Sequence, residues 1–205
     1  MDKFGHYLKW DVFTKTLERK QIGYFSLYDA LRLFPTHAAG IYKILSRKVG
    51  EGKLIHLKRN LYCLPDGLPN EYLLANILYQ PSYISLEFAL SHYGLIPETV
   101  YTITSVTTKP TRQFTVTNRA FTYHTIRQYA YTGYVPTRQE NYTILIATKE
   151  KALADYLYFA WRHHRPISER IDWRKINAQE VRHMLDGLFG LNPHTVKTLL
   201  PPYDR

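Results

Sequence analysis

Basic side chains recur at helical intervals between residues 36 and 47. His37, Gly40, Lys43 and Arg47 are spaced by three, three and four residues, so a helix would carry them on one face. An arginine guanidinium can donate two hydrogen bonds to the edge of a guanine, and a lysine ammonium can pair with phosphate. The spacing therefore predicts a helix face that contacts DNA, with Arg47 as the residue that reads a guanine.

A second basic group follows in the sequence. Residues 54–57 and 61–64 are short β-prone runs, and the charged turn Lys58-Arg59-Asn60 between them predicts a hairpin. Asparagine tolerates the left-handed backbone that such a turn needs. We expect Lys58 and Arg59 to enter the minor groove or to hold its backbone. The residues expected to contact DNA are Thr36, His37, Gly40, Tyr42, Lys43, Arg47, Lys48, Lys53, Lys58, Arg59 and Asn60.

Within this set the expected roles differ. Lys43, Lys48 and Lys53 are expected near phosphates, and Gly40 would let the helix backbone approach the groove closely. Two alternatives to DNA binding remain open. The segment could be a solvent-exposed basic helix in a fold that only resembles a DNA-binding one. It could also belong to a module of the same fold that binds protein instead of DNA.

The elements that would position these residues can also be predicted. Helices are expected over residues 10–20, 26–34 and 37–49, with the hairpin after them. Ser26 and Asp29 have the spacing of a capping box, and Pro35 ends the second helix. Three helices followed by a β-hairpin is the element order of a winged helix-turn-helix, in which the third helix enters the major groove.

Composition agrees with a folded protein that has a polyanionic partner. The chain has 205 residues, a net charge of +10 and a pI near 9.6, and residues 32–59 hold seven basic residues against one acidic residue, Glu51. Its single cysteine, Cys63, cannot form an intramolecular disulfide. No apolar run approaches the roughly 20 residues that a membrane span needs. We expect a cytoplasmic protein with no membrane partner.

A second domain is predicted after a linker at residues 65–69, which gives domain boundaries of 1–67 and 68–205. Residues 101–108, 113–117, 120–126 and 142–147 are rich in Thr, Tyr, Val, Ile and Phe, and they predict strands of a mainly antiparallel sheet. Helices are expected on either side of these strands in the sequence. The predicted fold class is therefore α+β, with an N-terminal winged helix-turn-helix and a mixed second domain.

Residues that could act in catalysis form no convincing set. His163 and His164 are adjacent and point to different sides of a helix, and Glu150 and Asp155 diverge by about 140°. Asp155 is expected to cap or to pair with a basic residue in the core. We therefore expect no enzyme, no metal and no cofactor. A cluster of tyrosines after the strands is a candidate partner surface, although a sheet edge packed with aromatics explains it equally well: Tyr129, Tyr131 and Tyr134.

Four short motifs carry a resemblance to a known family. They are the basic hairpin at residues 58–64 (KRNLYCL), the segment at 83–95 (YISLEFALSHYGL), the strand piece at 121–124 (FTYH) and the helix at 147–155 (ATKEKALAD). In this order and spacing the chain resembles the AbiEi-type antitoxins, which are regulators of viral defence systems. Those proteins usually have glycine where Asn60 stands here, and past His163 the likeness fades.

The resemblance implies a transcriptional repressor and antitoxin of an abortive-infection system. Its first domain would bind inverted repeats in the operator of its own operon, and its second would oppose a nucleotidyltransferase-like toxin. The Gly-Ser and paired acidic residues of such a toxin are missing from this sequence. Two other functions remain open: a plain winged-helix transcription factor with a ligand-sensing or dimerising second domain, and a nucleic-acid-processing enzyme.

Overall fold

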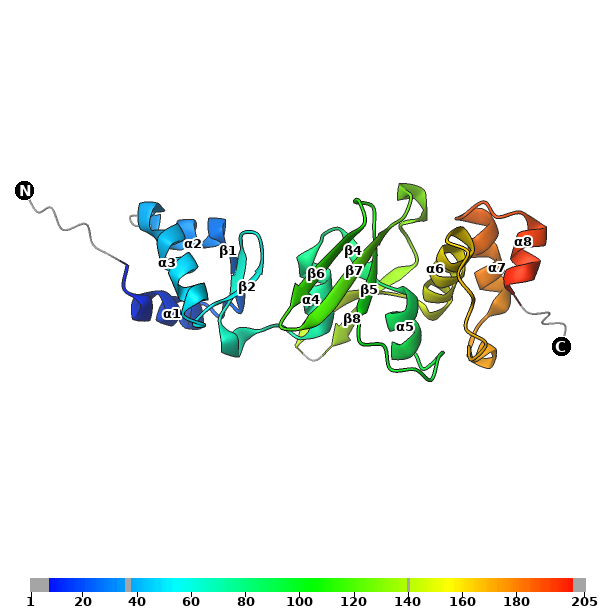
Figure 1. Cartoon of the computed structure of the whole chain (residues 1–205), viewed down its shortest axis with the longest axis horizontal. Coiled ribbons are helices and arrows are strands. Elements are labelled where there is room, and N and C mark those ends of the chain that lie inside the picture. Colours follow the sequence, from blue (N-terminus) through cyan, green and yellow to red (C-terminus); the bar gives the residue numbers. More distant parts are fainter. Residues whose placement is uncertain (1–7, 36–37, 140, 201–205) are drawn as a thin grey trace, which may run out of the picture. The chain divides into compact units, whose positions relative to one another are not determined.

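The computed structural model describes residues 8–35, 38–139 and 141–200. The chain has a mixed α+β fold and divides into two compact units, Met1–Asn70 and Glu71–Arg205 (Figure 1). Each unit has helices and a sheet of its own. The units are called unit 1 and unit 2 below.

Unit 1 begins with helix α1 (Trp10–Arg19), which strand β1 (Tyr24–Ser26) follows. Next come helices α2 (Leu27–Leu33) and α3 (Ala38–Gly50), and then strands β2 (Ile55–Lys58) and β3 (Leu61–Cys63). The three strands form a sheet in the order β1-β3-β2, in which β3 is antiparallel to both neighbours. The predicted hairpin is thus confirmed, and β1 adds a third strand to it.

Local hydrogen bonds explain where two of these elements begin and turn. Ser26 Oγ accepts a bond from the Asp29 backbone N–H at 3.1 Å, and the Asp29 carboxylate accepts one from the Ser26 N–H at 2.8 Å. This is the predicted capping box. A hydrogen bond from the Ser26 hydroxyl to the Asp29 carboxylate is the main cause of the lowered pKa of Asp29, and the bond from the Ser26 N–H adds to it. At the hairpin, Asn60 has a φ of 63°, which is the left-handed backbone expected there. Its carbonyl accepts a bond from the Leu27 N–H at 3.0 Å and so ties the hairpin to α2.

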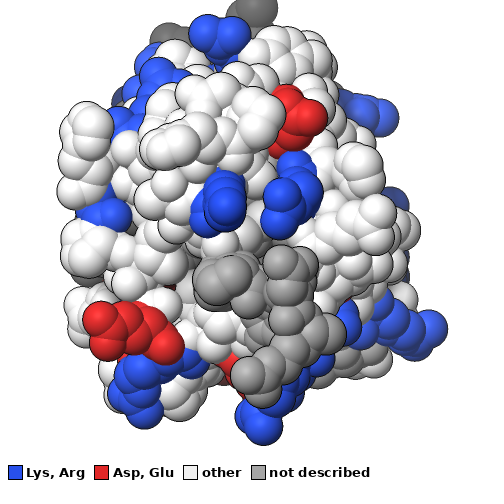
Figure 2. All heavy atoms as spheres, turned by 90° about the vertical axis from the view of Figure 1, so that its right-hand side faces the viewer, with Lys and Arg blue, Asp and Glu red and all other residues white. Residues whose placement is uncertain are grey.

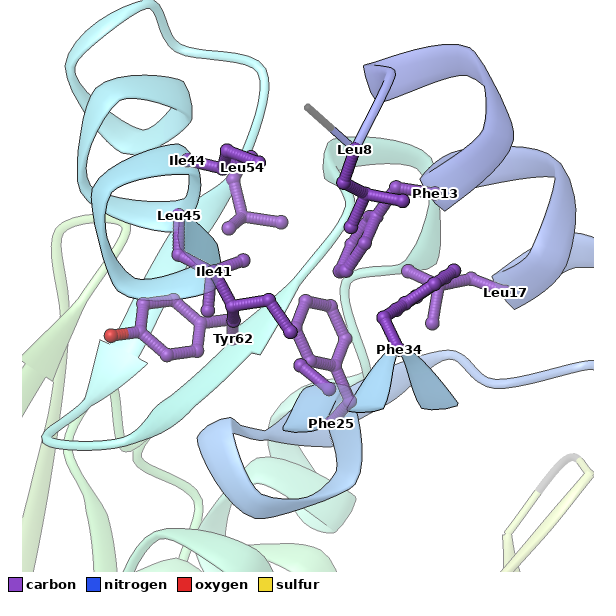
Figure 3. Packing of buried hydrophobic residues seen from close by; sticks show 11 residues of the cluster. Leu8, Phe13, Leu17, Phe25, Phe34, Ile41, Ile44, Leu45, Leu54 and Tyr62 are labelled. Atoms are coloured by element: carbon purple, nitrogen blue, oxygen red, sulfur yellow. The ribbon is translucent and has the colours of Figure 1, made fainter. Parts of the chain in front are cut away.

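The core of unit 1 is built from aromatic and branched residues of all three helices and the sheet. Figure 3 shows Phe13, Phe25 and Phe34 meeting at its centre, where the Phe13 ring lies 5.4 Å and 5.1 Å from the other two. From α3 come Ile41, Ile44 and Leu45, all buried. A short 3-10 turn at Pro65–Gly67 follows the last strand.

Unit 2 is larger and contains a six-stranded sheet with helices packed on it (Figure 1). Its strands are β4 (Ser82–Ile84), β5 (Ile103–Thr107), β6 (Arg112–Val116), β7 (Arg119–Thr125), β8 (Tyr134–Gln139) and β9 (Tyr142–Ala147). Its α-helices are α4 (Glu71–Leu78), α5 (Leu86–His92), α6 (Lys149–Arg162), α7 (Ala178–Gly187) and α8 (Pro193–Leu199), and 3-10 turns lie at Gln128–Ala130 and Trp173–Lys175.

The sheet of unit 2 is mixed. The strand order is β6-β7-β5-β4-β9-β8, and the pairs β5–β7 and β4–β9 are parallel whereas the other three pairs are antiparallel. The expectation of a mainly antiparallel sheet therefore holds only in part. The sequence analysis also missed two strands. One is β4, which has only three residues, and the other is β8, which contains Pro136.

A buried ionic cluster joins the centre of this sheet to α6. Lys151 and Asp155 form an ion pair, and both side chains are fully buried. The Asp155 carboxylate also accepts hydrogen bonds from Tyr83 Oη at 3.1 Å and Ser85 Oγ at 2.7 Å. The prediction that Asp155 pairs with a basic residue in the core is confirmed. Ser85 occupies the N-cap position of α5, but its hydroxyl donates to Asp155 and caps no backbone N–H.

Within the described ranges, none of the helices combines the length and the apolar character that crossing a bilayer requires.

Candidate nucleic-acid interface

Helix α3 has one buried and one exposed side. Ile41, Ile44 and Leu45 are at most 8% exposed and pack into the core of unit 1. On the other side Tyr42 is 64% exposed and Lys43 is exposed as well. The Arg47 side chain is 66% exposed, so both predicted cations of this face can reach a ligand in solvent.

Lys48 does not belong to this face, and its predicted phosphate contact is wrong. The residue is only 7% exposed, and its Nζ donates to Glu51 Oε2 at 2.6 Å. The ammonium also lies 5.5 Å from the centre of the Trp10 ring, within the range of a cation–π contact. Lys48 follows the buried Leu45 by three residues and the buried Ile41 by seven. This periodicity could have indicated its inward position from sequence alone.

Glu51 holds three basic residues at the end of α3. Besides the bond from Lys48, its carboxylate lies 3.6 Å from Arg47 Nε and 3.5 Å from Lys53 Nζ. The hydrogen bond from Lys48 is the main reason why the pKa of Glu51 is lowered. Arg47 and Lys53 have side chains that are 66% and 58% exposed, and exposed ion pairs are weak. Both cations can therefore exchange Glu51 for a phosphate at little free-energy cost.

The tip of the β2–β3 hairpin carries the second basic group. Arg59 is exposed, and Lys58 and Asn60 are half-buried. The register of the two strands shifts between His56 and Lys58, which marks an irregularity directly before the turn. The left-handed Asn60 then reverses the chain, so the two basic residues lie where the hairpin turns.

The other residues that were predicted to contact DNA from α3 say less about the interface. Thr36 and His37 lie outside the described residues. Ala38, the first residue of α3, is exposed. A Cβ atom added at Gly40 would meet no heavy atom of the described chain within 4 Å. Packing within unit 1 therefore does not require glycine at position 40.

Basic residues are more concentrated in unit 1 than on the face of the protein that carries the C-terminal helices. Figure 2 views the face that carries the C-terminal helices, and there Lys and Arg side chains are scattered among uncharged residues with acidic groups between them. By contrast, residues 32–59 of unit 1 contain seven of the basic residues and one acidic residue.

The tyrosine cluster of unit 2 divides into a packed part and an exposed part. Tyr131 and Tyr134 are half-buried, and their rings lie 5.1 Å and 4.7 Å from the ring of the buried Tyr83. They pack against the ionic cluster, which agrees with the alternative of a sheet edge packed with aromatics; a partner surface at these two residues stays a prediction. Tyr129 remains exposed at 57%, and its hydroxyl accepts a bond from Arg127 Nη1 at 2.9 Å.

The residues that were considered for catalysis have the following surroundings in the structure. Asp155 is sealed in the core, whereas Glu150 Oε1 accepts a 3.4 Å bond from the Asn177 N–H. His163 stacks on Phe159, and His164 is exposed. Among the residues that the structure describes, no three His, Cys, Asp or Glu side chains converge in the way that a metal site requires.

Comparison of the chain with protein-family models and with curated proteins found no match.

Proposed function

We propose that unit 1 is a winged helix-turn-helix that binds duplex DNA, and that the protein regulates transcription. The observation that carries this proposal is the two-sided character of α3. Its apolar residues anchor it in the core, while Tyr42, Lys43 and Arg47 extend into solvent on the other side.

The dimensions of this helix suit the DNA major groove. An α-helix with its side chains is about 10–12 Å wide, and the groove is about 12 Å wide. Arg47 would donate two hydrogen bonds to a guanine, and Lys43 would pair with a phosphate beside the groove. Open space around the Cβ position of Gly40 leaves room for a phosphate or sugar to approach the helix backbone. The hairpin residues Lys58 and Arg59 would hold the flanking backbone or minor groove.

The number of cations in the proposed interface gives a quantitative expectation. Lys43, Lys53, Lys58 and Arg59 would neutralise up to four phosphates, while Arg47 contacts a base. Counterion release then predicts that the logarithm of the association constant falls with the logarithm of salt concentration with a slope of roughly −3 to −4. A slope near zero would contradict a phosphate-dominated interface.

The test uses the full chain and a matched pair of double variants. Lys43→Ala/Arg47→Ala removes two cations four residues apart from α3. Lys15→Ala/Arg19→Ala removes two exposed cations with the same spacing from α1. We expect the first variant to lose at least tenfold in affinity for duplex DNA in a fluorescence-anisotropy titration and the second to change it by much less. Equal losses would show that only net charge matters, and unchanged binding by the α3 variant would refute the interface.

The role as repressor and antitoxin remains a proposal that depends on the family resemblance. It predicts that the chain binds an inverted repeat in its own operator and opposes a nucleotidyltransferase-like toxin encoded beside it. Co-expression of the full chain with the neighbouring gene tests this directly. Restored growth supports an antitoxin. If the neighbouring gene is harmless, or remains toxic when this chain is present, a plain transcription factor is the better interpretation.

A further inference from the structure

Unit 2 contains a cleft of about 410 Å³ that the proposed DNA interface does not use. Its walls come from the sheet strands β5 and β7, from the beginning of α5 and from the last turns of α6 with the segment that follows. Binding sites for small molecules usually measure about 300–1,000 Å³ and combine an apolar lining with a few polar groups. The cleft has this size and this character.

Three aromatic rings form one side of the cleft. The Phe159 ring lies 5.4 Å from the imidazole of His124, which is tilted by 59° to it, and 5.9 Å from that of His163, whose plane is nearly parallel at 6°. All three residues line the cleft. These rings provide apolar surface against which a planar apolar body can pack face to face or edge to face.

Basic and acidic side chains both line the cleft, among them Glu87, His163 and Arg165. Burial is the main cause of the lowered pKa of His124, and the nearby Arg165 and His163 lower it further. Burial likewise raises the pKa of Tyr156, and the nearby carboxylates of Glu87 and Glu98 add to that effect. Arg165 is therefore the cation of the cleft that acts on His124.

One polar atom in the wall has no partner. Thr104 and Thr122 face each other in register on β5 and β7, and both line the cleft. Thr104 Oγ1 donates to the Ser85 carbonyl at 2.6 Å and accepts from the Phe88 N–H at 3.1 Å. Thr122 Oγ1 is buried and has no hydrogen-bond partner within the described chain. Buried hydroxyls are normally paired, so an unpaired one in a cleft wall indicates a place for a ligand.

One residue in the wall of the cleft has an unfavourable backbone conformation. Leu86, the first residue of α5, has a φ of 60°, which a branched side chain rarely adopts. Hydrogen bonds fix the residues on both sides of it to Thr104, including one from the Ser85 N–H to the Thr104 carbonyl at 3.1 Å. Strain that the surrounding structure maintains in this way is a frequent property of binding sites.

We propose that this cleft binds a small organic anion with a flat apolar body, such as an aromatic carboxylate. The body packs against Phe159, and the acid group lies among Arg165, His124 and the Thr122 hydroxyl. A rotation of the Thr122 side chain would bring its hydroxyl to the acid group, which supplies the acceptor that it lacks, and the negative charge of the acid would pair with the guanidinium of Arg165. This inference concerns unit 2 and does not depend on DNA binding by unit 1.

The probe for this site is 1-naphthoate, and 1-naphthylmethanol serves as its neutral counterpart. Titration of the full chain by calorimetry should show saturable binding of the acid and much weaker binding of the alcohol. Arg165→Gln should weaken naphthoate binding roughly tenfold, because a charge-assisted hydrogen bond is lost. Arg182→Gln is the matched control, since this exposed arginine on α7 does not line the cleft, and it should leave binding unchanged.

A second variant separates ligand binding from folding. Thr122→Val keeps the shape of the side chain and removes the unpaired hydroxyl. It should leave the melting temperature unchanged or raise it, and it should still weaken naphthoate binding several-fold. Absence of saturable binding at millimolar naphthoate would overturn the proposal. Equal affinity for the alcohol, or an equal effect of Arg182→Gln, would overturn it as well.

Discussion

Lys151 and Asp155, one turn apart on α6, form an ion pair in which neither side chain is accessible to solvent. Burial raises the pKa of Asp155, and the contacts from Lys151, Ser85 and Tyr83 oppose this shift. A charge pair in this position is stable only while both partners are present, because a single buried charge loses its hydration without compensation.

We therefore expect Asp155→Asn to destabilise the protein by about 3–5 kcal/mol in chemical denaturation. The double variant Lys151→Met/Asp155→Leu should lose much less, because it leaves no buried charge. Asp172→Asn is the control, since the partner of Asp172 is Arg174, whose side chain is 86% exposed, and little change is expected there. A double variant as unstable as Asp155→Asn would contradict this account.

Substitutions of Lys43 and Lys48 should have different effects, one on DNA binding and the other on the stability of the fold. Lys43 is exposed and Lys48 is buried against Trp10 and Glu51, although both are lysines of α3. Lys48→Ala should destabilise the protein by about 1–2 kcal/mol, because it removes the packing of the aliphatic stem and the bond to Glu51. Lys43→Ala should weaken DNA binding at unchanged stability. Thermal melts and DNA titrations on both variants test this, and the reverse pattern would refute the assigned orientation of α3.

The hairpin turn gives a prediction about backbone conformation. Asn60 has a φ of 63°, where an ordinary side chain is disfavoured by about 1–2 kcal/mol and glycine is not. Asn60→Gly should thus be neutral or slightly stabilising, and Asn60→Val should destabilise by about 1–2 kcal/mol. Denaturant midpoints give the answer, and equal effects of the two substitutions would show that φ is not the cause.

The buried thiol gives a prediction about pH. Burial raises the pKa of Cys63 from 9.0 to about 11, so the native state keeps its proton where the unfolded state has lost it. Between these two values the native state binds more protons, and stability must therefore fall as pH rises from 9 to 11. The expected loss from this group is about 1–3 kcal/mol.

Comparison with Cys63→Ala isolates this contribution, because other groups also titrate above pH 9. The difference in unfolding free energy between the two proteins should shrink with rising pH. In the native protein the thiol should also react slowly with alkylating reagents at neutral pH. Rapid alkylation of folded protein would show that the thiol is not protected.

Structural features were predictable from the sequence where all the interacting residues lie within a few positions of one another. The capping box of Ser26 and Asp29 and the left-handed turn at Asn60 each involve only a few neighbouring residues. The exposed positions of Lys43 and Arg47 follow from helical periodicity. The burial of Lys48 follows from the same periodicity, but its charge favoured an exposed position in the prediction.

Features that depend on distant contacts were not predictable. Strand β4 has three residues, and pairing with β5 and β9 on its two sides makes it the link between the two halves of the sheet. Serine before a helix commonly caps it, yet the Ser85 hydroxyl donates to Asp155, 70 residues away. Tyr131 and Tyr134 likewise pack on Tyr83, which is distant in sequence, and local sequence does not reveal such tertiary contacts. The cleft at His124 and Phe159 forms only when β7 and α6 come together.

The position of β4 also sets the order in which the units can mature on the ribosome. Ile84 of β4 pairs with Ile146 of β9, so the larger sheet needs the strand that ends at Ala147, whereas the smaller sheet is closed by Cys63. The intervening 84 residues take roughly 4–17 s to synthesise at 5–20 residues per second. The N-terminal unit can therefore be folded for several seconds while its companion is still an incomplete nascent chain.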